Sequence, residues 1–412
     1  QFAVHDVMQA PIMKGWQPKY QSLQYMVQTN QEVDSVILDE IVEAYCNDIE
    51  LPPAELELIH ALDLESNLNG FPGVTFIDKI NRNTSMGFPW NESKRHYLIP
   101  LPANDIWQHP VDITNEVKLR MEIIEDKLRR GERACPVFSA SLKDEPVSQA
   151  KVDNAKTRVF CAAPVDYSLV MRKYLLTFVR VLQRNKFVFE AAPGTQAQTI
   201  EWELIYQHLT KFGSERIVAG DYSKFDKRMN PAFILAAFKV ITNICKRAGM
   251  SDEEIKIIDT MSHDVAFPLT NYFGELIMFM GTNPSGHPLT VIINSLVNSL
   301  YMRYAYHQLN PDKEAKTFQE NVALMTYGDD NAMGVSIRAP WFNHTAIQKI
   351  LEKIGVVYTM PDKETESVPY SHISEVSFLK RSFVFDETLG HVVCPIEHAS
   401  IEKMLTKCVH KK

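Results

Sequence analysis

The residues VALMTYGDDNAMGVS, at positions 322–336, place two adjacent aspartates between two apolar runs. This pattern predicts a hairpin, with strands at 322–326 and 332–336 and a tight turn at 327–330. An isolated Asp-Asp pair at a turn is most often a solvated turn element. Here both flanking strands are apolar enough to be buried, and a second acidic pattern lies upstream. Together these features favour a functional role for the pair.

That second pattern is Asp221-Tyr222-Ser223-Lys224-Phe225-Asp226, which follows a short apolar strand. A capping residue, a proline or a glycine marks most element boundaries between the two patterns and beyond them. The predicted order is strand, helices, hairpin, helix, strand, which is a βαββαβ arrangement. Its elements are a strand at 217–219, a helix from 231 to 248, a helix from 252, a long apolar helix ending near 309, the hairpin, a helix at 341–354 and a strand at 356–359.

In a βαββαβ sheet the first strand and the hairpin lie side by side in the middle. Asp221 would therefore face Asp329 and Asp330 across adjacent strands. Three carboxylates converging at one sheet edge need cations, and hard oxygen ligands of this kind suit Mg²⁺. Two such ions about 4 Å apart would clamp the attacking and leaving oxygens of an in-line phosphoryl transfer.

The charge distribution is uneven along the 412 residues, whose formal net charge is −8. An acidic balance argues against a nucleic-acid binder, but residues 1–70 hold twelve acidic and only two basic side chains. Residues 143–186 hold nine basic and four acidic side chains. A basic segment in an acidic protein is what a focused anion channel requires, and a solvated helix face is the alternative.

The six cysteines form no CxxC pair, which argues against a zinc ribbon and a disulfide scaffold and favours a reducing compartment. No apolar run approaches the roughly 20 residues that span a bilayer. The length of the chain predicts several subdomains around a large core.

Taken in order, the motifs resemble the palm of a picornavirus-like positive-strand RNA virus RNA-dependent RNA polymerase. They are Asp221…Asp226, Ser285-Gly286-xxx-Thr290-xxx-Asn294-Ser295, Tyr327-Gly328-Asp329-Asp330 and Phe378-Leu379-Lys380-Arg381. The resemblance extends over roughly residues 70–400 through the template-entry loop 84–89, the basic finger 143–158 and Pro361-Asp362-Lys363. The pair His287-Pro288 resembles the invertebrate and algal picorna-like branch.

The resemblance implies an α+β, right-hand polymerase fold with an antiparallel βαββαβ palm and helical or mixed fingers. We expect fingers at 1–216, a palm at 217–375 with a fingers insertion near 250–280, and a palm–thumb hairpin at 376–412. Strands at 376–385 and 391–394 would form that hairpin. Because 31 residues follow Arg381, we expect a short, truncated thumb.

The resemblance also implies roles for individual residues. Asp221 and Asp329 would be the principal ligands of two Mg²⁺ ions, with Mn²⁺ as a substitute, and Asp330 an auxiliary ligand. Lys363 would protonate the leaving pyrophosphate. Ribose and nucleotide contacts would come from Asp226, Ser285, Gly286, Thr290, Asn294, Lys143, Lys151, Lys156 and Arg158, and RNA contacts from Thr84, Ser85, Gly87, Lys380 and Arg381.

Simpler interpretations stay open for several of these residues. Asp226 could be an exposed turn acid and Asn294 a satisfied amide in mid-helix. Lys363 could be a surface lysine in a polar loop, and the Lys380-Arg381 pair a solvated sheet edge.

The implied function is RNA-templated RNA synthesis from ribonucleoside triphosphates by two-metal-ion nucleotidyl transfer. The implied partners are an RNA template and primer, a protein-linked primer and other viral replication proteins, with no direct membrane span. The chain would be released from a polyprotein and act at replication complexes in the host cytoplasm.

Two alternative functions remain. A reverse transcriptase is disfavoured because that class places a bulky aromatic residue where Asp226 stands. A weakly active RNA-binding fragment is favoured only by the short C-terminus.

Overall fold

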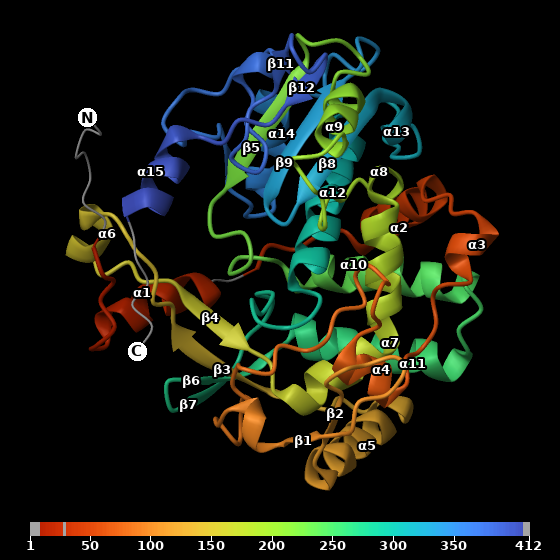
Figure 1. Ribbon diagram of the computed structural model, residues 1–412. Coiled ribbons are helices and arrows are strands. Elements are labelled where there is room, and N and C mark those ends of the chain that lie inside the picture. The colour runs from red at the N-terminus through yellow and green to blue at the C-terminus, as the bar shows by residue number, and fades with distance from the viewer. Residues whose placement is uncertain (1–8, 28–29, 407–412) are drawn as a thin grey trace.

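The computed structural model of the chain describes residues 9–27 and 30–406 (Figure 1). The first eight residues of the predicted fingers and the last six of the predicted thumb lie outside the described residues. One four-stranded sheet occupies the top of the view in Figure 1, and a second lies at the lower left. Helices fill the space between them and cover the lower right.

The first sheet has the strand order β10-β5-β9-β8, and its neighbouring strands are antiparallel. Its strands are β5 (Ile217–Tyr222), β8 (Val322–Tyr327), β9 (Asp330–Val335) and β10 (Tyr358–Thr359). The predicted βαββαβ order is therefore present, with β5 and the hairpin side by side. Gly220 of β5 lies opposite Asn331 of β9, so Asp221 falls at the same sheet edge as the hairpin turn.

Both faces of this sheet are buried, which explains why its strands are continuously apolar. Alternate residues of a strand point to opposite faces. Val218 and Met333 belong to the large core with α12 (Thr290–Leu309) and α14 (His344–Lys353). Ala219 and Ala332 belong to a smaller core with α9 (Glu201–Leu209).

The helices between β5 and the hairpin begin where the sequence predicts. Asn230 caps α10 (Pro231–Arg247) by accepting from the backbone N–H of Ala232. Ser251 and Glu254 form a complete capping box at the start of α11 (Asp252–Ala266). These caps satisfy backbone donors that a helix start leaves unpaired.

The second sheet joins segments that are far apart in the chain. Its order is β4-β3-β6-β7, with β3 and β6 parallel and the other pairs antiparallel. The strands are β3 (Val137–Leu142), β4 (Val159–Ala162), β6 (Leu269–Tyr272) and β7 (Glu275–Met278). A backbone bridge from Ala162 to Gly286 connects this sheet with the loop that precedes α12.

The remaining elements surround these two sheets. They are α1 (Gln17–Met26), α2 (Ser35–Asp48), α3 (Pro53–Leu56), α4 (Leu64–Asn69), β1 (Leu98–Pro100), β2 (Val111–Ile113), α5 (Asn115–Arg129), α6 (Gln149–Asp153), α7 (Val165–Arg184), α8 (Lys186–Phe189), α13 (Phe318–Asn321), β11 (Val384–Asp386), β12 (His391–Val393), α15 (His398–Thr406) and two 3-10 turns, Lys94–His96 and Ile373–Glu375.

The predicted strand at 376–385 is wrong over most of its length, and only β11 remains of it. Phe378 and Arg381 exchange backbone hydrogen bonds of 2.9 and 3.0 Å across a two-residue turn. Leu379 and Lys380 in this turn have φ values of 54° and 57°, which a strand does not allow. The helix predicted at 341–354 begins at His344, with Asn343 as its N-cap.

In the described part of the chain, no helix has both the length and the apolar character that a bilayer crossing needs.

Candidate active site

Three aspartates meet at one edge of the first sheet because of the register of its strands. Asp221 is the penultimate residue of β5, opposite Thr359 of β10. Gly328 and Asp329 form the two-residue turn between β8 and β9, where Tyr327 pairs with Asp330. Gly328 adopts a φ of 63°, which glycine reaches without steric cost.

The turn is held from beneath by α12. The hydroxyl of Ser295 accepts from the N–H of Gly328 at 2.9 Å. The amide of Asn298 donates to the carbonyls of Gly328 and Asp330 at 3.0 and 3.2 Å. Asn298 in turn accepts from the hydroxyl of Tyr222 on β5 at 2.9 Å. One helix therefore fixes the turn relative to the neighbouring strand.

Burial is the largest cause that raises the pKa of the two hairpin aspartates. Burial raises the pKa of Asp330 to about 7, with smaller contributions from the charges of Asp329 and Asp221. Asp329 is exposed as a whole residue, but partial desolvation of its carboxylate raises its pKa, and the charges of Asp226 and Asp221 add to the effect. Both shifts disfavour the charged form of these two carboxylates.

The three predicted metal ligands are not equally placed. In the described part of the chain, no three His, Cys, Asp or Glu side chains are grouped as a metal site requires. The carboxylate of Asp330 accepts from the N–H of Leu379 at 2.6 Å, which ties it to the turn at 378–381. Nζ of Lys363 lies 2.6 Å from Oδ2 of Asp221, but that buried oxygen has no partner in hydrogen-bonding geometry.

The residues that would hold a divalent cation are Asp221 and Asp329, because hard carboxylate oxygens suit Mg²⁺. Oδ2 of Asp221 is paired with the ammonium of Lys363, so such an ion would replace that ammonium beside the carboxylate. Asp330 fits an auxiliary position, since its carboxylate already has a backbone partner.

A cavity of about 1010 Å³ opens beside the carboxylate edge. Its lining holds eight basic side chains and two acidic ones, Asp226 and Asp329. The basic residues are Lys143, Lys151, Lys156, Arg158, Lys224, Lys227, Lys363 and Lys380. Such a lining suits a polyanion the size of a triphosphate.

The basic finger supplies four of these cations. Lys143 and Arg158 flank Glu145, with N–O distances of 3.1 and 3.3 Å, so one carboxylate holds both. Within the described residues, no carboxylate pairs with Lys151 or Lys156, and their charges remain available to a ligand.

Sequence reasoning missed two of the cations. Lys224 and Lys227 lie within and next to the pattern 221–226, so their proximity to the aspartates was visible. Lys227 is held by a 2.5 Å hydrogen bond from its Nζ to Ser22 of α1, and burial lowers its pKa. Nothing in the sequence of α1 signals that contact.

The loop before α12 lies at the edge of the same cavity through Ser285, whose hydroxyl accepts from the N–H of Cys161 at 3.2 Å. A Cβ on Gly286 would lie 2.8 Å from the carbonyl oxygen of Cys161, so this position requires glycine for close approach to β4. The hydroxyl of Thr290 donates to the carbonyl of Pro284 at 2.8 Å and closes the loop. The side chain of Asn283 contacts that of Asn294, and its backbone N–H contacts the backbone carbonyl of Asp226. Asp226 lines the cavity, whereas Asn294 is not among its lining residues.

The predicted RNA contacts are more dispersed. Lys380 lines the cavity, whereas Arg381 donates to the carbonyl of Cys394 at 3.0 Å. Thr84, Ser85 and Gly87 do not line it. The hydroxyl of Thr84 accepts from Nζ of Lys94 at 2.5 Å, and that of Ser85 accepts from the N–H of Gly87 at 3.1 Å.

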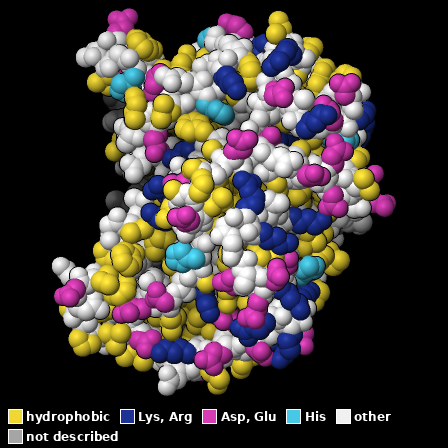
Figure 2. Space-filling model, turned by 90° about the vertical axis from the view of Figure 1, so that its right-hand side faces the viewer, with side chains coloured by type: hydrophobic (Ala, Val, Ile, Leu, Met, Phe, Trp, Pro, Cys, Tyr) yellow, Lys and Arg dark blue, Asp and Glu magenta, His cyan; other side chains and the backbone are white. Residues whose placement is uncertain are grey.

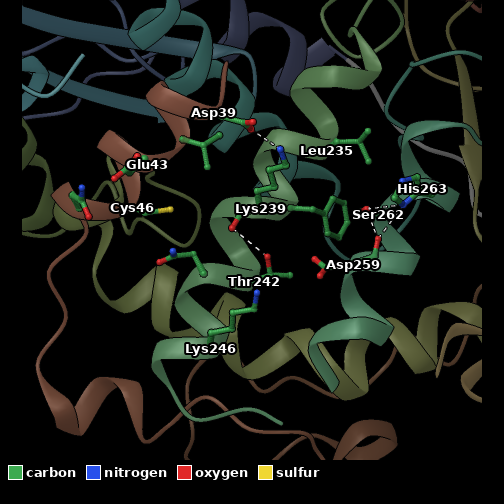
Figure 3. Close-up of a pocket in the computed structure, with 14 residues that line it drawn as sticks. Asp39, Glu43, Cys46, Leu235, Lys239, Thr242, Lys246, Asp259, Ser262 and His263 are labelled. Atoms are coloured by element: carbon green, nitrogen blue, oxygen red, sulfur yellow. Dashed lines mark hydrogen bonds and ion pairs between the residues drawn. The ribbon is translucent and has the colours of Figure 1, made fainter. Parts of the chain in front are cut away.

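A second hollow, of about 500 Å³, lies between α2, α10 and α11 (Figure 3). It holds the ion pair of Asp39 and Lys239, with an N–O distance of 2.5 Å, and it shares no lining residue with the larger cavity. Figure 2, which views the right-hand side of Figure 1, likewise shows acidic and basic side chains interspersed. The excess of basic over acidic side chains in the large cavity is absent from the lining of the smaller hollow.

Comparison with known proteins agrees with the motif order. The family described as viral RNA-dependent RNA polymerase matches residues 16–406. The replicase polyprotein of Cricket paralysis virus is 32% identical over 367 residues, which cover 84% of this chain and 20% of the polyprotein. The RNA1 polyprotein of Cowpea mosaic virus is 28% identical over 401 residues, or 90% of this chain and 20% of the polyprotein. The chain thus spans about a fifth of the length of these relatives.

A solved structure described as the Sicinivirus 3Dpol RNA dependent RNA polymerase superposes with a TM-score of 0.78 at 19% identity. The match covers 98% of this chain and 84% of the other, and it confirms the predicted α+β polymerase fold. The picorna-like resemblance inferred from the motifs is confirmed, and the chain belongs to the viral RNA-dependent RNA polymerase family.

Proposed function

We propose that the chain synthesises RNA on an RNA template from ribonucleoside triphosphates, as the polymerase of a positive-strand RNA virus. The single observation that carries this proposal is the adjacency of the aspartate edge and the cavity with its eight basic side chains. A site that joins metal-binding carboxylates to a triphosphate-sized basic pocket suits nucleotidyl transfer.

Each group has a distinct task in this proposal. Arg158 and the finger lysines bind the triphosphate, and Asp221 and Asp329 hold the divalent ions, with Asp330 auxiliary. Two such ions would lower the pKa of the primer 3′-hydroxyl and neutralise charge on the phosphates. The 3′ oxygen bonds to the α-phosphorus, and the bond from that phosphorus to pyrophosphate breaks. Nζ of Lys363 donates a proton to the leaving pyrophosphate, and the hydroxyl proton passes to solvent.

The proposed substrates extend to the RNA strands. The loop carrying Thr84, Ser85 and Gly87 would contact the template, and the turn carrying Lys380 and Arg381 the primer backbone. The division into fingers at 1–216, a palm at 217–375 and a palm–thumb hairpin from 376 remains a prediction. We further propose release from a polyprotein and action with other replication proteins and a protein-linked primer at cytoplasmic replication complexes.

Primer extension tests the proposal. An annealed RNA primer–template is incubated with Mg²⁺ and ribonucleotides, and the parent chain is compared with Asp329→Ala. The matched control is Asp312→Ala, which removes an exposed carboxylate after α12. We expect extension by the parent and the control and none by Asp329→Ala. Equal extension by all three proteins, or a preference of the parent for deoxyribonucleotides, would overturn the proposal.

A further inference from the structure

The loop before α12 contains a chain of hydrogen bonds that runs from a backbone donor to the amide of Asn294. Its two internal members are His287 and Asn283, which are 7% and 2% exposed. Neither side chain touches the aspartates of the carboxylate edge. Each link has one possible direction, and these directions together determine which end of Asn294 is free.

The imidazole of His287 is fixed in one tautomer. Its Nδ1 lies 3.2 Å from the backbone nitrogen of Leu289, whose N–H can only donate. Nδ1 therefore accepts, and in a neutral ring the proton resides on Nε2. Burial lowers the pKa of His287 to about 3, so the ring stays neutral at physiological pH.

The amide of Asn283 is fixed at both ends. Nε2 of His287 lies 2.8 Å from one end, which must be the oxygen because that nitrogen donates. The other end lies 3.2 Å from the carbonyl of Thr290, which can only accept, so that end must be the NH₂ group. The two assignments are independent and agree, and rotation of this amide would break both bonds.

The orientation of Asn283 then sets that of Asn294. The Asn283 NH₂ group donates to Oδ1 of Asn294 at 2.8 Å. The NH₂ group of Asn294 has no acceptor among the residues that the structure describes. The backbone N–H of Asn283 also donates to the carbonyl of Asp226 at 2.8 Å. One residue thus contacts the side chain of Asn294 and the backbone of Asp226.

We propose that Asn283 and His287 are positioning residues for the selection of ribonucleotides. They hold Asn294 so that its NH₂ group faces the sugar. The ribose 2′-hydroxyl then accepts from Asn294 and donates to Asp226. This proposal rests on the proposed function, and it adds what determines substrate choice at that site. A 2′-deoxyribonucleotide would leave both groups unpaired, which is the strongest basis for rejecting an analogue.

Single-nucleotide incorporation tests this role. We compare kcat and KM for a ribonucleotide and its 2′-deoxy analogue between the parent and Asn283→Leu. We expect the ratio of the two kcat/KM values to fall roughly tenfold or more. The fall comes from the ribonucleotide, while use of the deoxy analogue changes little.

The matched control is Asn310→Ala, which removes a buried asparagine at the opposite end of α12. Its Nδ2 donates to the carbonyl of Glu314 at 3.0 Å. We expect this variant to leave the substrate ratio unchanged. If Asn283→Leu lowers both kcat/KM values alike or keeps the ratio, the positioning role is refuted.

A second measurement needs no turnover. Long-range ¹H–¹⁵N correlation spectra of the whole chain report the tautomer and charge of each histidine, and His287→Gln assigns the signal. We expect the Nε2–H tautomer, uncharged at pH 5. An Nδ1–H tautomer or a charged ring would overturn the proposal. A parent that makes no product with either nucleotide, but keeps this signature, would instead contradict the proposed function.

Discussion

Replacing Asn298 by leucine tests whether α12 holds the turn that carries Asp329. Asn298 is completely buried, and leucine has nearly its shape. The change removes three hydrogen bonds, to the carbonyls of Gly328 and Asp330 and from the hydroxyl of Tyr222. A leucine side chain has no polar atom, so it cannot replace any of these hydrogen bonds.

The magnitude follows from the number of groups left unpaired. A buried polar group that loses its partner costs about 1–3 kcal/mol. Three such groups at about 1 kcal/mol each lower the free energy of unfolding by at least about 3 kcal/mol. The three contributions belong to one network, so they do not add strictly. Tyr222→Phe removes only the 2.9 Å bond to Asn298 and should cost about 1 kcal/mol.

Urea denaturation of both variants, followed by far-UV circular dichroism, measures the two losses in the free energy of unfolding. We expect Asn298→Leu to lose roughly three times as much as Tyr222→Phe. We also expect a lower kcat for Asn298→Leu, because the backbone that carries Asp329 is no longer fixed. Equal losses for the two variants would refute the reasoning, since the turn carbonyls would then contribute nothing.

Four further predictions concern other parts of the chain. Arg303→Met should cost about 3–5 kcal/mol of unfolding free energy, because buried Glu190 loses its 3.0 Å ion pair; a loss under about 1 kcal/mol in urea denaturation would contradict this. For His287, the folded pKa of about 3 lies below the unfolded value of 6.5, so only the unfolded chain gains a proton between these pH values. The parent should therefore lose up to about 1.4 kcal/mol per pH unit as the pH falls below 6.5, and His287→Gln should flatten that slope; parallel stability profiles would exclude the buried neutral ring. Lys156→Ala should raise the KM for ribonucleotides several-fold with a much smaller change in kcat, since this cation lines the cavity without a carboxylate partner among the described residues; an unchanged KM in steady-state kinetics would remove it from the triphosphate path. Gly286→Ala should lower the melting temperature, because the new Cβ would lie 2.8 Å from the carbonyl of Cys161; an unchanged thermal melt would show that the loop can move away from β4.

The sequence predicted the parts of the site that depend on local chemistry. Glycine at 328 permits the tight turn, and the length of that turn sets the register of the two apolar runs on either side. Asn230 and the pair Ser251–Glu254 mark helix starts because their side chains satisfy backbone donors. From these signals the strand order followed, and with it the approach of Asp221 to the turn.

The tertiary structure alone decided the contacts between segments that the chain separates widely. The turn at 378–381 captures the carboxylate of Asp330, which no local pattern near either segment indicates. Helix α1 supplies Ser22 to Lys227 across about 200 residues of chain, and Glu190 meets Arg303 in the core. Such contacts depend on how whole elements pack. The residues that packing brings together are far apart in the chain and show no common pattern in the sequence.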